Sequence, residues 1–180
     1  MRQAVRSLLA AALGLALCGA STLAADPPQA GASLRGLDGK AVGEATFVQG
    51  PTGVLIRLEL RGVAPGPHGL HLHAVGRCEA ADKFQSAGSH IGADGVMHGL
   101  LAEEGPHAGD LPNVNVREDG TASVELFTTY VTLRDDEGTF RLLDEDGSAL
   151  VLHAKADDQM TQPGGGTGDR IACGLLAATE

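Results

Sequence analysis

The sequence of 180 residues is short of positive charge and of long apolar segments, and no internal repeat is visible in it. Its 13 lysine and arginine residues are outnumbered by 23 aspartate and glutamate residues, so the formal net charge is −10. This balance argues against nucleic acid or an anionic membrane as a partner. An anionic substrate would need a local positive field to offset the charge of the whole protein.

The N-terminus carries the one sustained apolar run, Leu8 to Ala20. The run is too short to cross a bilayer, which takes about 20 apolar residues. Arg2 and Arg6 precede it, and a stretch typical of a signal-peptidase cleavage site follows it at Thr22-Leu23-Ala24. This pattern predicts a signal peptide over residues 1–24. We therefore expect an exported protein, periplasmic or secreted, without membrane contact after cleavage. Loss of the two arginines takes the formal charge from −10 to about −12.

Cysteine is also scarce, with three residues in the whole chain. Cys18 lies in the predicted signal peptide; a lipid anchor there is an alternative that Leu17 disfavours, because a small residue is expected at that position. Cys78 and Cys173 remain, and an even number in an oxidising compartment predicts one disulfide. This bond would close a loop of about 95 residues and contribute about 4–5 kcal/mol. Two unpaired buried thiols are the alternative, which fits an exported protein less well.

The mature sequence is typical of one β domain. About 155 residues are enough for a single hydrophobic core. Val54, Ile56 and Leu58 recur at every second position, which is the period of a strand with one buried face. The dipeptides Asp38-Gly39 and Asp119-Gly120 are typical of tight hairpin turns.

Eight short strands are expected in all. We place them at Ser33–Gly36, Ala41–Gln49, Val54–Leu60, Leu70–Val75, Asn113–Arg117, Ala122–Phe127, Ala149–His153 and Ile171–Leu176. Short strands with glycine-rich joints predict an all-β fold, either a Greek-key β-sandwich or a flattened eight-stranded β-barrel. The domain is expected over residues 33–180, after an N-terminal linker over residues 25–32.

Two stretches depart from this pattern and are expected to be long functional loops. Arg77 to Pro112 shows little alternation, and loops of that length are uncommon unless they are functional or cross-linked. Lys155 to Asp169 contains Pro163-Gly164-Gly165-Gly166, which is typical of a flexible linker. The polar connection from Thr128 to Gly147 has no assigned structure, and Phe140–Leu143 within it suits either a helical turn or a short strand.

All seven histidines lie between His68 and His153, and six of them form two overlapping metal-ligand sets with Asp110. His71 and His73 are two residues apart, so on a strand they share one face and can bind a single ion. The other members of the sets are His90, His98, His107 and the distant His153. Three imidazoles with one carboxylate suit zinc, and four imidazoles suit copper.

Three blocks of sequence resemble the copper/zinc superoxide dismutase family. They are Gly69-Leu70-His71-Leu72-His73, the run His90…His98…His107-Ala108-Gly109-Asp110, and Arg170-Ile171-Ala172-Cys173-Gly174. The blocks occur in the order of the family and span almost the whole mature chain. The resemblance is to the exported, periplasmic type found in bacteria. It implies an oxidoreductase that converts superoxide to dioxygen and hydrogen peroxide.

The resemblance also implies both cofactors and their ligands. Copper would be bound by His71, His73, His90 and His153, and zinc by His90, His98, His107 and Asp110. The shared His90 would bridge the two ions, because its ring has two opposed nitrogens. In the family copper changes oxidation state, zinc fixes the loop, and the bridging histidine, here His90, carries a catalytic proton.

Three further residues match positions with known roles in the family. Asp157 matches the carboxylate that hydrogen-bonds one ligand of each metal, here His71 and His98. His68 matches a histidine that braces nearby backbone without binding metal. Arg170 matches the arginine beside copper that attracts and orients the anion.

The sequence departs from the family pattern beside the bridging histidine. Ser89 replaces the usual preceding glycine, and Ile91-Gly92-Ala93 replaces an aromatic-Asn-Pro run, which leaves the pose of the zinc loop open. Lys155 is the one lysine of the second loop. Electrostatic guidance of the anion is therefore expected to be weaker than in many members, or to come from Lys83 and Arg77.

Two other classes of function remain as alternatives. One is a binding protein that holds zinc or buffers exported copper without turnover, and the other is a structural or adhesive domain on the same fold. Retention of His153 and Arg170 favours the enzyme. Asp157 beside Asp158 is alternatively a solvated acidic pair. Subunit contacts differ among bacterial members of the family, so both a monomer and a homodimer are open.

Overall fold

The computed structural model describes residues 26–135 and 138–179. The expected signal peptide over residues 1–24 lies outside the described residues. Within them the chain is almost entirely β-structure, which confirms the predicted fold class, and the helices are two single 3₁₀ turns, η1 (Ala80–Asp82) and η2 (Gln85–Ala87). In this part of the chain no helix has the length and apolar character needed to cross a membrane.

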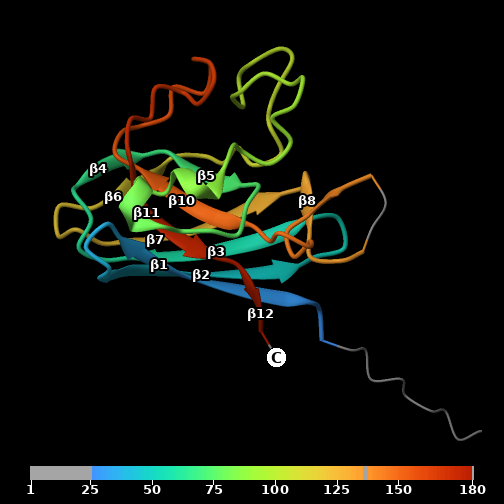
Figure 1. Ribbon diagram of the computed structural model, residues 1–180, viewed down its shortest axis with the longest axis horizontal. Helices are drawn as coiled ribbons and strands as arrows, with labels where there is room; N and C mark the ends of the chain where they lie inside the picture. Colours follow the sequence, from blue (N-terminus) through green and yellow to red (C-terminus); the bar gives the residue numbers. More distant parts are fainter. Residues whose placement is uncertain (1–25, 136–137, 180) are drawn as a thin grey trace, which may run out of the picture.

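One antiparallel sheet of eight strands curls into a half-barrel (Figure 1). Its order in space is β5 (Leu70–His73), β10 (Ala149–His153), β11 (Arg170–Leu175), β1 (Gln29–Gly36), β2 (Ala41–Gln49), β3 (Val54–Leu60) and β7 (Ala122–Thr128), with β12 (Ala177–Ala178) paired to β1. The register sets Phe47 opposite Ile56 and Ala45 opposite Leu58. These four side chains are buried, so one face of the sheet forms the core.

A short segment covers the remaining side of the barrel. The segment consists of β4 (Gly66–His68) and β5, which Gly69 separates. Its first strand pairs with β6 (Val114–Val116), and its second strand pairs with β10. A tight turn connects β6 to β7, in which the Arg117 N–H donates to the Thr121 carbonyl at 2.8 Å. Because β3 pairs with β7 rather than with β4, the chain crosses the end of the barrel, as in a Greek key.

Most strand bounds agree with the alternation of the sequence. The predicted strands Ala41–Gln49, Val54–Leu60 and Ala149–His153 match β2, β3 and β10. The linker predicted over residues 25–32 is wrong at its C-terminal end, since β1 begins at Gln29. Ala30 and Ala32 point into the core there, but alanine adds little to an apolar pattern.

The polar connection between β7 and β10 contains a pair of two-residue strands. β8 (Val131–Thr132) runs parallel to β9 (Phe140–Arg141). The segment Phe140–Leu143 therefore begins as a short strand rather than a helical turn. Two residues are too few to show a period, so neither strand was assigned in advance.

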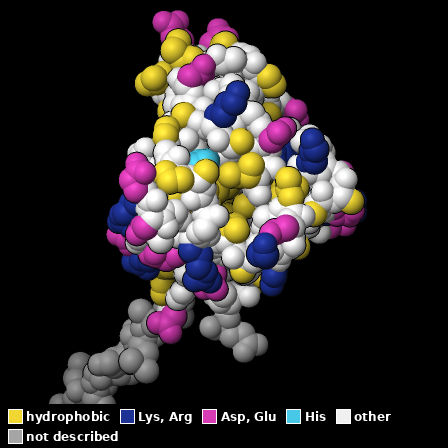
Figure 2. Space-filling model, turned by 90° about the vertical axis from the view of Figure 1, so that its left-hand side faces the viewer, with side chains coloured by type: hydrophobic (Ala, Val, Ile, Leu, Met, Phe, Trp, Pro, Cys, Tyr) yellow, Lys and Arg dark blue, Asp and Glu magenta, His cyan; other side chains and the backbone are white. Residues whose placement is uncertain are grey.

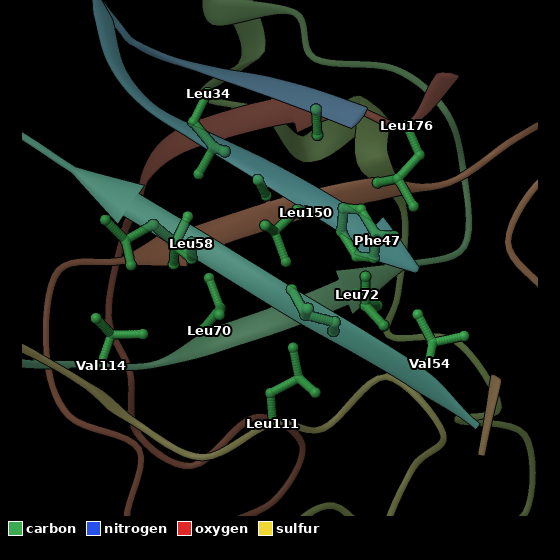
Figure 3. Packing of buried hydrophobic residues seen from close by; sticks show 14 of the residues in the cluster. Leu34, Phe47, Val54, Leu58, Leu70, Leu72, Leu111, Val114, Leu150 and Leu176 are labelled. Carbon is green, nitrogen blue, oxygen red and sulfur yellow. The ribbon is translucent and has the colours of Figure 1, made fainter. Parts of the chain in front are cut away.

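The hydrophobic core lies inside the curled sheet (Figure 3). Phe47 is fully buried at its centre, and Leu70 and Leu72 extend from β5 into the same cluster. Since successive side chains of a strand point to opposite faces, His71 and His73 lie on the other face of β5. The core thus fixes the strand that carries the paired histidines.

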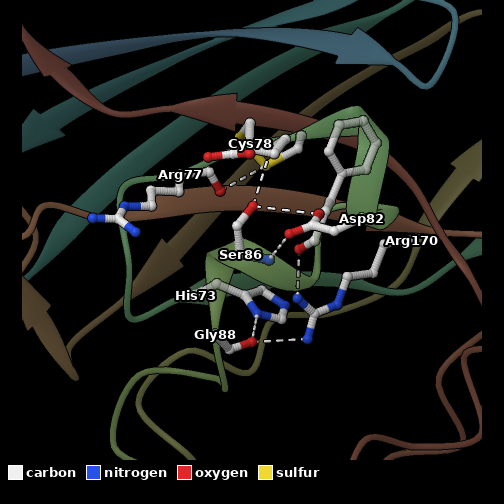
Figure 4. Close-up of a disulfide and its surroundings, with 10 residues drawn as sticks. His73, Arg77, Cys78, Asp82, Ser86, Gly88 and Arg170 are labelled. Atoms are coloured by element: carbon white, nitrogen blue, oxygen red, sulfur yellow. Dashed lines mark hydrogen bonds between the residues drawn. A yellow bond between two sulfur atoms is a disulfide. The ribbon is translucent and has the colours of Figure 1, made fainter.

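The predicted disulfide between Cys78 and Cys173 is present, with its Cα atoms 5.6 Å apart (Figure 4). Beside it Phe84, 2% exposed, packs in a second small cluster with Ala87 and Val151. The bond connects the first long loop to β11, and the aromatic ring fixes the next turn of that loop. Covalent and apolar contacts therefore supply the order that the loop backbone does not provide.

Replacement of both cysteines, C78A/C173A, should lower the free energy of unfolding by about 4–5 kcal/mol. The unfolded chain regains the entropy of the loop that the disulfide closes across a separation of 95 residues. Urea unfolding of the metal-free protein, followed by circular dichroism, measures the difference. A loss below about 1 kcal/mol would contradict the argument, because the unfolded chain would then be compact without the bond.

Candidate metal centre

The backbone of β5 positions both halves of the centre. The strand carries His71 and His73, and isolated β-bridges join these residues to Asp110 and His90 of the first long loop. Neighbouring β10 ends at His153. All five side chains are at most 8% exposed. Residues far apart in the sequence therefore meet because the loop hydrogen-bonds to a strand of the barrel.

One group consists of four buried histidines whose candidate ligand atoms all lie within 4.8 Å of one another: His71, His73, His90 and His153. Three nitrogens of this group are buried without a hydrogen-bond partner, namely His71 Nδ1, His73 Nε2 and His153 Nε2. Buried polar atoms are normally paired, so three orphans in one place call for an explanation. A bound cation would satisfy all three.

The other nitrogen of each of these rings has a protein partner. His71 Nε2–H donates to Asp157 Oδ2 at 2.6 Å, and His73 Nδ1–H donates to the Gly88 carbonyl at 2.9 Å. His153 Nδ1 lies 3.1 Å from Thr167 Oγ1. These contacts set the tautomers, because a neutral ring that donates from one nitrogen presents a lone pair at the other.

The electrostatics keep these rings neutral. Burial lowers the pKa of His71 to about 4 and that of His153 to about 3, and it holds the pKa of His73 well below its ordinary value. Neighbouring histidines add to the effect in each case. These three imidazoles therefore offer lone pairs near neutral pH, and imidazole ligands suit copper.

The second group surrounds Asp110, which is 2% exposed. Its Oδ1 lies 2.8 Å from His90 Nδ1, 3.0 Å from His98 Nδ1 and 3.5 Å from His107 Nδ1. His107 Nδ1 is also 3.3 Å from His90 Nδ1. The three Nδ1 atoms thus converge on one carboxylate oxygen, and three nitrogens with one carboxylate oxygen are a donor set that suits zinc.

One cluster of possible ligand atoms on this side differs in one member from the predicted set. It contains His71, His90, His98 and Asp110, whose candidate ligand atoms lie within 4.8 Å of one another. His107 lies just outside it, with its Nε2–H donating to the Val96 carbonyl at 3.0 Å. Its Nδ1 nevertheless faces the same carboxylate, as the sequence predicts.

His98 lies between two buried carboxylates. Its Nδ1–H donates to Asp110 and its Nε2–H donates to Asp157, each at 3.0 Å. Burial on its own would lower the His98 pKa, but the two hydrogen bonds raise it to about 9. Burial would raise the pKa of both carboxyls, but hydrogen bonds from His90 and His98 hold that of Asp110, and hydrogen bonds from His71 and His98 that of Asp157, far below the ordinary value. A metal at Nδ1 therefore has to displace a proton.

His68 and Arg170 both contact backbone carbonyls around the centre. His68 lies within hydrogen-bonding distance of two backbone carbonyls, at 2.7 Å and 2.8 Å, and so braces backbone. Arg170 donates from Nη1 to the Phe84 carbonyl at 2.7 Å and from Nη2 to the Gly88 carbonyl at 2.8 Å (Figure 4). Partial burial lowers the pKa of Arg170 from its very high ordinary value. Two carbonyls of the first loop thus orient the guanidinium.

An open cavity of about 770 Å³ leads to the centre between the two long loops. His90, His153 and Arg170 line it, and histidine shows as one small patch on the surface in Figure 2. Arg170 is the one lysine or arginine in the described lining, so Lys83 and Arg77 do not face the cavity. Within this cavity a single guanidinium therefore provides the positive charge.

Glycines and a glutamine contribute in ways that the sequence analysis missed. The run Pro163–Gly166, expected to be a flexible linker, packs on the centre: a Cβ on Gly165 would overlap Asp157 Oδ1 and press on His98 Nε2. Gln162 accepts from the His98 N–H at 2.8 Å and donates to its carbonyl at 2.9 Å. The glycines themselves were the one available signal, since such close approach requires them.

Comparisons with known proteins agree with this geometry. The family model described as copper/zinc superoxide dismutase matches residues 41–176. A Cu-Zn superoxide dismutase of Caulobacter vibrioides is 44% identical over 173 residues, which cover 96% of this chain and 99% of that protein. A second, from Aquifex aeolicus, is 39% identical over 149 residues and covers 82% and 86% of the two chains.

Solved structures extend the likeness to the fold. A SOD-like protein from Bacillus subtilis has a TM-score of 0.76 and 35% identity, over 82% of this chain and 97% of that one. The Cu/Zn superoxide dismutase from Brucella abortus has a TM-score of 0.64 and 26% identity, over 82% and 98%. The matched residues include both histidine groups. The chain therefore belongs to the copper/zinc superoxide dismutase family, and it is an oxidoreductase that uses copper and zinc.

Proposed function

We propose that the protein dismutes superoxide with a copper ion that a histidine bridges to a structural zinc ion. Copper is assigned to His71, His73, His90 and His153, and zinc to His90, His98, His107 and Asp110. Asp157 orients one ligand of each metal. Arg170 and His90 are the catalytic side chains, the first for the anion and the second for a proton.

The three orphaned nitrogens carry this proposal. Each imidazole of the copper group except His90 has one nitrogen fixed by the protein and the other free. A pure zinc binder has no need of His153, which comes from a separate strand. Burial of a lone pair that no protein group satisfies costs free energy. A bound ion would offset this cost, which explains why the three nitrogens are left without protein partners.

His90 is suited to the bridging position. Its Nδ1 lies 2.8 Å from Asp110 Oδ1, on the side of the zinc group. On the side of the copper group, its ring centre is 4.1 Å from that of His71 and 4.9 Å from that of His73. The ring is 8% exposed and lines the open cavity, so a small molecule can approach it. Both nitrogens of one imidazole can act as donors to different ions.

The bound metals have separate tasks: copper supplies the one-electron couple of dismutation, and zinc, which has no redox chemistry, fixes the loop. The chain does the rest. Arg170 attracts superoxide into the cavity against the net charge of −10 and orients it there. His90, when its Nε2 is not bound to copper, would carry a proton at that nitrogen for the departing peroxide.

We further propose that the protein acts outside the cytoplasm. The disulfide supports an oxidising compartment, and the relatives compared above are bacterial proteins. Superoxide is the small-molecule substrate, while nucleic acid remains an unexpected partner of so acidic a chain. The signal peptide over residues 1–24, the absence of membrane contact and the choice between monomer and homodimer stay predictions.

The decisive experiment follows superoxide decay with the mature, disulfide-intact protein. Protein that contains zinc alone should be inactive, and addition of copper should give cyanide-sensitive decay near the diffusional ceiling of about 10⁸–10⁹ M⁻¹s⁻¹. Metal content is verified for every sample. A fully loaded protein no faster than buffer would instead support the copper-binding or zinc-binding alternative.

Arg170→Ala should slow dismutation about tenfold at low ionic strength, because it removes the one cation of the cavity lining. The deficit should shrink as salt is added, since salt screens the attraction. Arg57→Ala is the matched control, because Arg57 lies on β3, outside this cavity, and pairs with exposed Glu125. Equal rates for the two variants at low salt, with both metals bound, would remove the role assigned to Arg170.

Gly165→Ala should weaken zinc binding about 10- to 100-fold, the usual cost of losing a carboxylate that orients ligands. The added methyl group would displace Asp157 from His98. Gly166→Ala is a close control, since both glycines have a positive φ, of 68° and 65°, but a methyl at 166 meets no atom. Chelator competition measures both affinities. Equal losses in the two variants would point to backbone strain alone.

A further inference from the structure

Thr167 is a buried hydroxyl residue on the second long loop, 4% exposed, three residues before Arg170. Its Oγ1 donates to the Gly164 carbonyl at 2.9 Å. With its hydrogen committed there, the same oxygen accepts from His153 Nδ1–H at 3.1 Å. The hydroxyl thus connects a histidine of the copper group to the backbone of the glycine run.

The glycine run in turn packs on the other end of the group. A Cβ on Gly164 would lie 3.7 Å from His90 Cε1 and 3.8 Å from His90 Nε2, so the backbone there covers the edge of that ring. Thr167 therefore contacts His153 directly and reaches His90 through Gly164. Both histidines line the open cavity, as does Thr167 itself.

Two observations separate the hydroxyl from a purely structural role. The backbone of Thr167 is held independently, because its carbonyl accepts from the Lys155 N–H at 2.9 Å. The backbone of His153 is held as well, because its N–H donates to the Gly69 carbonyl at 2.9 Å. The hydroxyl of Thr167 therefore acts on the ring nitrogen of His153 and is not needed to hold the backbone of either residue.

We propose that Thr167 is a positioning residue of the copper site. Its hydroxyl increases the donor strength of His153 and holds the Gly164 turn over His90. This inference rests on the copper ligands assigned above. An acceptor at the distal N–H of a ligating imidazole raises the basicity of the ligand. More basic ligands favour the higher oxidation state of the metal. Loss of the hydroxyl should loosen copper and raise its reduction potential, with little effect on zinc.

The test compares Thr167→Val, Thr167→Ala and Thr167→Ser in protein loaded with both metals. Valine keeps the shape but places a methyl group near His153, and alanine removes the hydroxyl without that crowding. Copper release to a chelator should be about tenfold faster in both, within the usual range for lost support of a metal ligand. The reduction potential should rise, and serine should restore both values.

Thr132→Val is the matched control. Thr132 is 2% exposed, and its hydroxyl hydrogen-bonds to Gln49 and to the Arg134 N–H, away from the metal centre. It should lose stability without any change in copper release or potential. Equal changes in Thr132→Val and Thr167→Val would show a general effect of a lost buried hydroxyl and overturn the inference.

The remaining outcomes separate this inference from the proposed function. If the native protein retains copper at the assigned histidines but Thr167→Ala releases it at the native rate and potential, the role of Thr167 is wrong and the function stands. If Thr167→Ser behaves like Thr167→Ala, the hydroxyl is not the active group. If the native protein binds no copper at these histidines, both the function and the inference fail.

Discussion

The carboxylate of Asp157 is the interaction on which the rest of the centre depends. Its Oδ2 accepts from His71 at 2.6 Å, and its Oδ1 accepts from His98 at 3.0 Å, so one side chain connects the two histidine groups. The Asn113 side chain donates from Nδ2 to the Asp157 carbonyl and accepts from the Asp157 N–H at Oδ1, both at 2.7 Å, which places Asp157 beside β6. A buried charge is tolerated only where such partners surround it, so the loops have to close around this carboxylate.

The two long loops therefore stabilise each other. Neither has strands of its own, apart from bridges to β5, and their polar backbone groups need partners. Two glutamines of the second loop supply several: Gln162 bonds both backbone groups of His98, and Gln159 accepts from the Leu100 and Leu101 N–H groups. The first loop is also tied to the barrel by the disulfide. Order at the metal centre is thus a property of the loop pair.

Local patterns in the sequence were enough for the features that are themselves local. Val54–Leu60 alternates over seven residues, and β3 has the same bounds. The ligand candidates were found because imidazoles at fixed spacings have few other uses, and because three blocks matched a family in order. The pairing of Cys78 with Cys173 followed from their even number in a chain that is expected to be exported.

Features that depend on contact between distant segments were beyond the sequence. The strands β4 and β8 exist because of their partners, and three or two residues show no period. The close approach of Gly165 to Asp157 and the two bonds of Gln162 to His98 are visible only after folding. A glycine run seen without its surroundings is typical of a linker, which is why the sequence of Pro163–Gly166 predicts one.

The carbonyl of Gly88 accepts from both His73 and Arg170, at 2.9 Å and 2.8 Å, which uses both lone pairs of one oxygen. One peptide plane therefore sets the angle of the imidazole assigned above to copper and of the guanidinium assigned above to the substrate. Evolution cannot adjust these two properties separately by reshaping this turn. Variation in anion attraction among relatives is better sought in the charges around the cavity, which can change without moving His73.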